Sequence, residues 1–204
     1  MTPIENANKY FAKYNKLKRT YEAGTRLIAE IKDEIMYLES IINAIDIATT
    51  ENDLNNIKDE LAVTGYIKRS GKSKSKGNTH NKPMHYVSSD GFDIYVGKNN
   101  IQNDELTFKF ATGGDWWFHA KQMPGSHVIV KTEGKELPDK TFEEAAALAA
   151  YYSKGRDLEK VEVDYVLKKE VKKPAGAKPG FVVYYTNYSL IAIADISGIR
   201  LISG

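Results

Sequence analysis

The stretch MHYVSSDGFDIYV, residues 84–96, decides the architecture of the C-terminal part of this 204-residue chain. Two short runs that contain β-branched and aromatic residues flank Ser89-Asp90-Gly91. An Asp-Gly step between such runs is typical of a tight β-hairpin turn. We therefore predict that residues 84–88 and 92–96 pair as antiparallel strands.

Strand-like patterns continue after this hairpin, and we expect further strands at residues 116–121, 126–131, 161–171, 181–185 and 189–194. Residues 104–111 are ambiguous, because LTFKF alternates like a strand while Asn103 or Asp104 could cap a short helix.

A helix is expected between these strands. Thr141-Phe142-Glu143-Glu144 has the composition of a capping box, which predicts a helix from Thr141 to about Ser153 that ends at Gly155. Together these elements predict an α+β domain over residues 84–204, with a compact, mainly antiparallel β-sheet and one or two helices.

Apolar residues near the N-terminus follow alternating steps of four and three, which is the spacing of a coiled-coil helix. Only Gly24 interrupts this seam, whose other members are Tyr10, Tyr14, Leu17, Tyr21, Ile28, Ile31, Ile35, Leu38, Ile42 and Ile45. A long amphipathic helix lying on a core would show similar spacing, but the strict alternation favours the coiled coil. Thr2-Pro3 suits the start of this helix, with Thr2 as its cap.

A second, shorter helix is predicted after a break at residues 49–52, with Leu54, Ile57 and Leu61 on one face. Either Thr50 or Asp53 could cap it. We therefore expect residues 1–64 to form a coiled-coil arm that includes a short second helix.

The net charge of +2 is unevenly distributed: residues 1–64 carry −3, residues 65–89 carry +6 and residues 90–204 carry −1. Ser, Gly and Asn are interleaved with the basic residues of 65–83, which predicts a basic flexible linker. This linker either contacts phosphates or only joins the two halves. The lysines and arginines of residues 7–26 likewise either meet a polyanion such as RNA or form an ordinary solvated helix face.

The absence of cysteine excludes disulfides, zinc–thiolate sites and thiol nucleophiles. No apolar run reaches the length of a membrane span, and the N-terminus lacks a signal-peptide pattern. We therefore expect a cytoplasmic protein that does not bind membranes.

Catalytic chemistry finds little support in the sequence. Asp115, His119 and His127 match no established metal-ligand spacing. Ser126 and His127 are adjacent, so a strand would point them to opposite faces, which disfavours a Ser–His catalytic pair. We expect no catalytic residue, no metal and no cofactor, and hence no enzyme activity.

The remaining polar pattern suits nucleic acid, because basic residues can contact phosphates while aromatic residues stack on bases. The basic residues in or beside predicted turns are Lys98, Lys121, Arg156, Lys172, Lys173 and Lys178. Trp116, Trp117, Phe118 and His119 lie between these turns. The alternative is that alternate residues of 116–118 fill the core, which we expect for at least one tryptophan.

Three segments resemble a known family: DIYVGKNNIQNDELTFKFATGGDWWFHAKQMPGSHVIV (93–130), AAALAAYYSKGR (145–156) and VKKPAGAKPGFVVY (171–184). Together they resemble the C-terminal RNA-binding domain of the NFACT family, which includes bacterial fibronectin-binding proteins and ribosome quality-control factors. Residues 6–19 and 34–45 resemble the family's coiled-coil middle region. The resemblance implies a C-terminal fragment with the second arm of a coiled-coil hairpin, followed by the RNA-binding domain over 84–204.

The resemblance further implies a module that binds RNA and the ribosome. Members of the family bind large ribosomal subunits that carry a stalled peptidyl-tRNA, recruit tRNA and support the addition of alanine tails without mRNA. The ribosome performs the peptide-bond chemistry. The coiled-coil arm would pair with the missing first arm or self-associate. The alternative implied by the family is an adhesin module, exposed at the cell surface, that binds fibronectin.

The matched motifs nominate loop residues for RNA contact, although one charged or amide residue in each loop could instead satisfy backbone groups. The candidates are Lys98, Asn99, Asn100, Gln102, Asn103, Asp115, Trp117, His119, Lys121, Ser126, His127, Arg156, Lys173 and Lys178. Pro124, Gly125 and Gly180 are expected to shape the loops.

Overall fold

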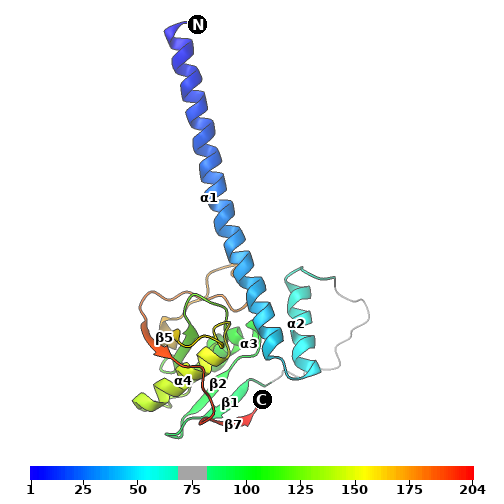
Figure 1. The fold of residues 1–204 in the computed structure, drawn as a ribbon, viewed down its shortest axis with the longest axis vertical. Helices are drawn as coiled ribbons and strands as arrows, with labels where there is room; N and C mark the ends of the chain where they lie inside the picture. Colours follow the sequence, from blue (N-terminus) through cyan, green and yellow to red (C-terminus); the bar gives the residue numbers. More distant parts are fainter. Residues whose placement is uncertain (69–81) are drawn as a thin grey trace. The chain divides into compact units, whose positions relative to one another are not determined.

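The computed structural model describes residues 1–68 and 82–204, so most of the predicted linker at 65–83 lies outside the described residues. The chain divides into two compact units, Met1–Leu38 and Glu39–Gly204. The long helix α1, Pro3–Ile47, begins in the first unit and ends in the second (Figure 1).

Helix α1 starts where the sequence predicts. The Thr2 hydroxyl accepts a hydrogen bond from the backbone N–H of Glu5 at 3.2 Å, and the Glu5 carboxylate accepts one from the backbone N–H of Thr2 at 2.7 Å. This reciprocal pair satisfies two backbone donors that the first helical turn leaves without intrahelical partners. The predicted cap at Thr2 is therefore confirmed.

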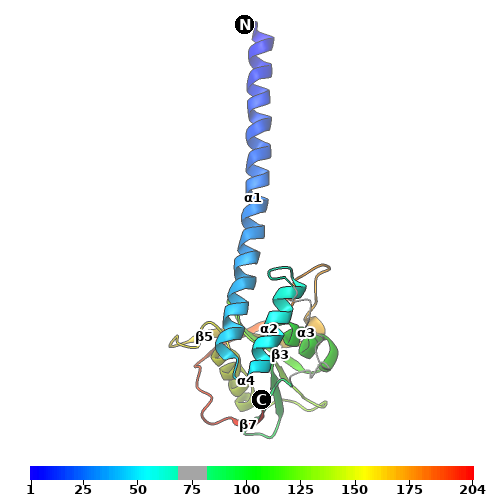
Figure 2. The same ribbon diagram turned by 90° about the vertical axis from the view of Figure 1, so that its right-hand side faces the viewer.

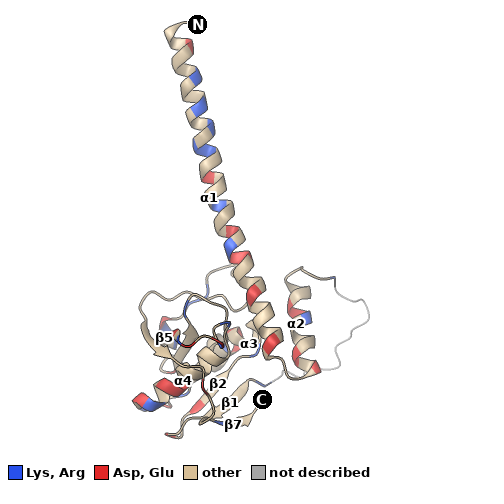
Figure 3. Cartoon of the chain, in the orientation of Figure 1, with Lys and Arg blue, Asp and Glu red and all other residues tan. Residues whose placement is uncertain are grey.

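The heptad seam of α1 is exposed along the first unit. Its apolar side chains from Tyr10 to Leu38 are between 38% and 75% exposed. Lys and Arg gather toward the N-terminal end of the helix and Asp and Glu toward its C-terminal end (Figure 3). Pairing of this seam with a second helix stays a prediction.

Helix α2, Glu51–Val63, is capped by Thr50 rather than by Asp53. The Thr50 hydroxyl accepts from the backbone N–H of Asp53 at 3.1 Å, and the Asp53 carboxylate accepts from that of Thr50 at 3.0 Å. Ile57 is the apolar residue of α2 that is buried, whereas Leu54 is 48% exposed.

The second unit contains a seven-stranded sheet in the order β6-β5-β3-β4-β2-β1-β7 (Figures 1 and 2). Every neighbouring pair is antiparallel, as predicted. The strands are β1 (Met84–Val87), β2 (Asp93–Val96), β3 (Trp116–Ala120), β4 (Val128–Val130), β5 (Val161–Leu167), β6 (Tyr188–Ala192) and β7 (Arg200–Ser203). Gly91 adopts a positive φ of 85° in the β1–β2 turn, which confirms the hairpin.

One strand prediction was wrong, and one strand was not predicted. The segment 181–185 forms only an isolated bridge between Val183 and Lys172, because it crosses the sheet face and packs Val182 and Tyr184 against a core cluster. Strand β7 was not predicted, and it pairs with β1 at the edge of the sheet, where its four residues stay exposed.

The ambiguous segment at 104–111 is helical. Helix α3, Asn100–Glu105, continues into a single π-helical turn at Leu106–Phe110. Asn99 caps α3, rather than Asn103 or Asp104 as expected, so the helix begins several residues earlier than predicted. A short 3₁₀ helix, Lys168–Glu170, follows β5.

The predicted capping box of helix α4 was also wrong. The helix runs from Asp139 to Tyr151, and its cap position, Pro138, makes no side-chain hydrogen bond. The Thr141 hydroxyl instead bonds Asp90 at 2.8 Å, and the Glu144 carboxylate accepts from the backbone N–H of Ser89 at 2.9 Å. These side chains hold the β1–β2 turn rather than their own helix end.

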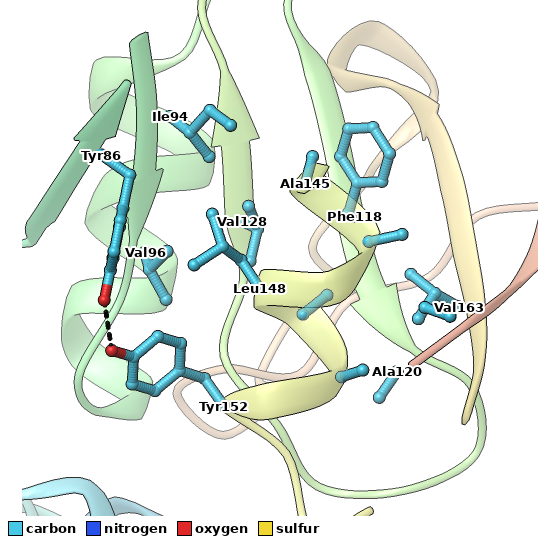
Figure 4. Close-up of a cluster of buried hydrophobic side chains, with 14 of the residues drawn as sticks. Tyr86, Ile94, Val96, Phe118, Ala120, Val128, Ala145, Leu148, Tyr152 and Val163 are labelled. Carbon is cyan, nitrogen blue, oxygen red and sulfur yellow. Dashed lines mark hydrogen bonds between the residues drawn. The ribbon is translucent and has the colours of Figure 1, made fainter. Parts of the chain in front are cut away.

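Helix α4 packs on one face of the sheet and forms the main core. Figure 4 shows Leu148 and Ala145 of α4 facing Ile94, Val128 and Phe118 of the sheet. Tyr86 and Tyr152 join their hydroxyls in a buried hydrogen bond of 2.5 Å at one end of this cluster. Successive side chains of a strand point to opposite faces of the sheet, so the residues next to these core residues lie on the other face.

The opposite face carries a second cluster. Trp117 and Ile129 lie here, together with Leu106 of the π-helical turn and Val166 of β5. Trp117 is fully buried, so the expectation that at least one tryptophan fills the core is confirmed.

The exposed seam gives a first prediction. Substitution Ile31→Asp places a charge on the seam and should abolish self-association of the chain, because a carboxylate cannot be buried between two helices without a partner. Sedimentation equilibrium over a range of protein concentrations measures this. The matched change Ala29→Asp lies off the seam and should leave association intact; a wild-type chain that stays monomeric at every concentration contradicts the prediction.

Candidate nucleic-acid interface

The loop that leads into α3 is shaped by its own side chains. The Asn99 side chain accepts from the backbone N–H of Gln102 at 2.9 Å, and Gln102 Oε1 accepts from the backbone N–H of Lys98 at 2.8 Å. Both amides are buried. Two candidate RNA contacts, Asn99 and Gln102, thus satisfy backbone groups, as the sequence left open for such residues.

Asn103 ties this loop to the segment after Pro124. Its Oδ1 accepts from the backbone N–H of His127 at 3.0 Å, and its Nδ2 lies 3.5 Å from the Gly125 carbonyl oxygen. A Cβ on Gly97 would stand 2.1 Å from Asn103 Oδ1, so only glycine fits there. The two loops that carry the sequence motif are therefore joined through one amide side chain.

Lys98 and Asn100 face helix α2. Lys98 Nζ lies 3.4 Å from Asp53 Oδ1, and both side chains are buried. Asn100 Nδ2 donates to Glu60 Oε1 at 2.9 Å and to Ser40 Oγ at 2.8 Å. Burial raises the pKa of the Asp53 carboxyl, but hydrogen bonds from Thr50 and the charge of Lys98 outweigh it and hold the pKa below its usual value.

A small polar cavity, with room for about one water molecule, lies beside these contacts. Its lining includes Asn43 and Ser40 from the last turns of α1, Lys98 and Asn100 from the loop, and Ser126. Ser126 is buried beside Pro124 and Gly125. A Cβ on Gly125 would stand 2.9 Å from Ser153 Cβ, which fits the expected loop-shaping role.

Aromatic rings gather on the sheet face opposite α4. The Trp117 ring stacks on His119 with a centroid separation of 5.5 Å, meets His127 in a T-shaped arrangement and lies tilted against Tyr184. Among the described residues, the buried Trp117 indole N–H has no hydrogen-bond acceptor. His127 is held by Thr107, whose hydroxyl lies 2.8 Å from Nδ1.

Both histidines of this cluster are neutral at neutral pH. Burial lowers the pKa of His119 to about 4 and that of His127 well below its usual value; the nearby His119 contributes to the second shift. The cluster therefore consists of uncharged rings, of which His119 and Tyr184 are partly exposed and Trp117 and His127 are buried.

Asp115 has a structural position. Its buried carboxylate accepts from the ammonium of Lys131, from the backbone N–H of Thr112 at 2.7 Å and from that of Thr132 at 3.1 Å. Burial raises its pKa, but these hydrogen bonds outweigh the effect and keep it low. Asp115 thus joins the start of β3 to the end of β4.

Four of the basic candidates are more exposed than the amide side chains. Lys121 is 32% exposed and pairs with Glu162, with Asp164 3.9 Å away. Lys173 pairs with Asp104 and donates to the Lys178 carbonyl oxygen at 2.9 Å. Arg156 and Lys178 are half-buried, and Lys178 Nζ donates to Tyr66 Oη at 2.8 Å.

The sequence did not nominate three further residues near these candidates, Asp164, Tyr184 and Phe110. Asp164 is buried on β5 and accepts from the Tyr184 hydroxyl at 2.8 Å. Tyr184 lies in the segment 181–185, whose apolar and aromatic residues were interpreted as a strand rather than as part of a site. Phe110 of the π-helical turn is 44% exposed beneath the Lys131 ammonium and was likewise not nominated.

The structure therefore separates the candidates into two groups. The buried ones are Lys98, Asn99, Asn100, Gln102, Asn103, Asp115, Trp117, Ser126 and His127, whereas His119, Lys121, Arg156, Lys173 and Lys178 are partly exposed. RNA contact by either group stays a prediction. Across residues 1–68 and 82–204, no group of acidic or histidine side chains could hold a metal, and no helix is long and apolar enough to cross a membrane.

The histidine pair gives a second prediction, on pH. The unfolded chain binds a proton at His119 with a pKa near 6.5, whereas the folded chain binds it only near about 4. The unfolded state therefore holds more protons in this window, and the free energy of unfolding falls as the pH drops through it. The effect of His119 is at most about 3 kcal/mol, at ~1.4 kcal/mol per pKa unit, and urea denaturation at a series of pH values measures it.

The variant His119→Phe is the control, because it keeps a stacking ring and removes the titration. Its stability should fall less steeply between pH 6.5 and about 4. The carboxyls of Asp53 and Asp115 lose their stabilising effect progressively from about pH 5 downward, but they do so alike in the wild type and the variant. The difference between the two slopes therefore reports His119. Equal slopes for the wild type and the variant contradict the prediction.

Gly180 gives a third prediction. It adopts a φ of +79°, and a Cβ there would stand 2.5 Å from Asn100 Oδ1. Gly176 has a similar φ of +75° with open space around it. Both Gly→Ala changes should cost about 1–2 kcal/mol of backbone strain, but Gly180→Ala should destabilise the fold more, because it also displaces Asn100. Urea denaturation of the two variants compares them; equal losses would refute the role of the Asn100 contact.

Comparisons with known proteins agree with the resemblance found in the sequence. Residues 1–80 match the family described as "NFACT N-terminal and middle domains", and residues 82–186 match "NFACT protein RNA binding domain". The chain is 46% identical over 185 residues to the Rqc2 homolog RqcH of Streptococcus suis, covering 90% of this chain and 33% of the relative. It is 39% identical over 196 residues to the Rqc2 homolog RqcH of Bacillus subtilis, covering 95% and 34%.

The chain thus spans about a third of the length of the curated relatives it matches. A solved structure, the C-terminal part of the fibronectin/fibrinogen-binding protein from Streptococcus suis, superposes with a TM-score of 0.85 at 44% identity. The alignment covers 96% of this chain and 77% of that one. The chain belongs to the NFACT family, and its residues 82–186 are that family's RNA-binding domain.

Proposed function

We propose that this chain is the RNA-binding part of a ribosome quality-control factor. The observation that carries the proposal is the match of residues 82–186 to the NFACT RNA-binding domain, in a chain whose relatives are named Rqc2 homologs. The partners would be the large ribosomal subunit and tRNA, in the cytoplasm, in support of C-terminal tailing of stalled chains without mRNA. The chain would act by binding and positioning, with no catalysis of its own.

The partly exposed basic side chains of the second unit support this role. Lys121 follows β3, Arg156 follows α4, and Lys173 and Lys178 share the loop before β6, all in one compact unit. Basic side chains of this kind neutralise phosphates. Their carboxylate partners, such as Glu162 and Asp104, hold them in place but leave further ammonium protons available.

The N-terminal part of α1 would supply a second contact. Lys9, Lys13 and Lys16 recur at steps of four and three, so they lie on one side of the helix, and all are exposed. We infer that this basic stripe meets RNA, while the apolar seam of α1 pairs with another coiled-coil helix.

A second candidate function is fibronectin binding. The observation that favours it is the similarity to the solved Streptococcus suis structure, which belongs to a fibronectin/fibrinogen-binding protein. A basic surface could serve both functions, so one experiment should compare them.

The fourth prediction tests both functions. The chain should bind tRNA and purified large subunits at about 50 mM salt and lose affinity steeply toward about 200 mM, because binding releases counterions. The double variant Lys121→Gln/Arg156→Gln should weaken binding several-fold and lower the salt slope by about one per lost phosphate contact. Filter binding or fluorescence anisotropy measures both quantities.

The matched control is Lys135→Gln/Lys140→Gln, which removes the same charge from exposed positions on and before α4. It should bind nearly as the wild type does. No binding to tRNA or subunits at low salt would refute the proposal. Saturable fibronectin binding that salt does not weaken, without RNA affinity, would favour the second candidate.

A further inference from the structure

Two of the residues nominated for RNA contact, Lys98 and Asn100, are buried in the fold. Lys98 and Asn100 are each only 5% exposed, so a ligand cannot reach their side chains in this conformation. What covers them is another part of the same chain: Asp53 and Glu60 of α2, with Ser40 of α1 as a further partner of Asn100. Helix α2 therefore controls access to the side chains of Lys98 and Asn100 in this conformation.

Helix α2 is attached to the loop mainly by polar contacts. Its buried residues are Asp53, Ile57 and Glu60, so two of the three are carboxylates. Leu54 and Val63, which could have strengthened an apolar interface, are 48% and 62% exposed. Beyond the end of α2, Tyr66 accepts a hydrogen bond from Lys178 Nζ at 2.8 Å and lies under the same ammonium at 5.3 Å from the ring centroid.

In these contacts, anionic carboxylates of α2 accept from donor groups of the loop. Lys98 Nζ meets a carboxylate oxygen at 3.4 Å, and Asn100 Nδ2 donates to a second carboxylate at 2.9 Å. A phosphodiester offers the same kind of acceptor, an anionic oxygen, to the same donors: lysine binds phosphate as a point charge, and amide side chains donate to phosphate oxygens.

We propose that Lys98, Asn100 and Lys178 form a phosphodiester-binding site for RNA, and that α2 occupies it as a built-in competitor through Asp53, Glu60 and the following Tyr66. RNA gains the site only when α2 moves away. This inference rests on the proposed function, because it concerns how the same domain binds RNA.

The other loop residues would keep the site formed after α2 leaves. Asn99 and Gln102 bond to the loop backbone, and Asn103 bonds to His127, so none of these contacts involves α2. The donors would therefore stay in place, while the small polar cavity beside Ser126 lies next to them.

Such a competitor lowers RNA affinity by the fraction of molecules in which the site is open. Weakening α2 should therefore strengthen RNA binding, which is opposite to the usual effect of damaging an RNA-binding protein. Asp53→Asn removes the charge that holds Lys98 and should raise the affinity for tRNA about tenfold.

The matched control is Asp59→Asn. Asp59 is exposed on the same helix, so this variant makes the same change in net charge without touching the loop. The gain of Asp53→Asn over Asp59→Asn is then the effect of opening the site. A second variant, Thr50→Ala, removes the hydroxyl that caps α2 and bonds Asp53, and should raise the affinity in the same direction.

Hydrogen exchange of the whole chain provides a readout that does not depend on affinity. Saturating tRNA should speed the exchange of the backbone amides of α2 and leave those of β3 and β4 protected. The same comparison without RNA shows whether Asp53→Asn opens α2 alone or unfolds the sheet; Thr50→Ala replaces it if the sheet unfolds.

The outcomes separate this inference from the proposed function. If the wild type binds tRNA, but Asp53→Asn and Thr50→Ala bind no more tightly than Asp59→Asn, the competitor role is overturned and RNA binding stands. Unchanged or slower α2 exchange in the presence of tRNA also overturns it. If no variant binds tRNA at low salt, the proposed function itself fails.

Discussion

The hydrogen bond from the backbone N–H of His127 to Asn103 Oδ1 is the contact on which the candidate site depends. It spans 3.0 Å and joins the loop that starts α3 to the segment that leads into β4. The absence of a side chain at Gly97 gives the amide its space. Because one side chain fixes both loops, the loop of Lys98 and Asn100 holds a defined position relative to His127.

The sequence predicted those features of the fold that arise from local periodicity. The β1–β2 hairpin followed from Asp90-Gly91, and the start of α1 from Thr2-Pro3, because turn and cap signals act within a few residues. Strand β7 was not predicted, because a short exposed edge strand has no buried face and so shows no alternation of apolar and polar residues. The segment 181–185 was misassigned because its apolar residues pack over the sheet instead of within it.

The candidate site was predictable in composition but not in arrangement. The resemblance placed Lys98 and Asn100 in a functional loop, but nothing in the sequence near them indicated that Asp53 and Glu60, some 40 residues away, would meet them. Such contacts depend on how α2 packs within the second unit. The same limit applies to Asp164, whose partner Tyr184 lies 20 residues farther along the chain.

The N-terminal turn of α4 has a consequence for folding. The side chains of Thr141 and Glu144, which in many helices would stabilise their own first turn, bond instead to Asp90 and Ser89, more than 50 residues earlier. The first turn of α4 has local bonds from the backbone N–H groups of Thr141 and Phe142 to the Pro138 carbonyl oxygen, and it gains the two side-chain bonds only when the β1–β2 turn is in place. The stability of this helix end is therefore coupled to that of the hairpin, so a change that disrupts the turn at Ser89 and Asp90 weakens the start of α4 as well.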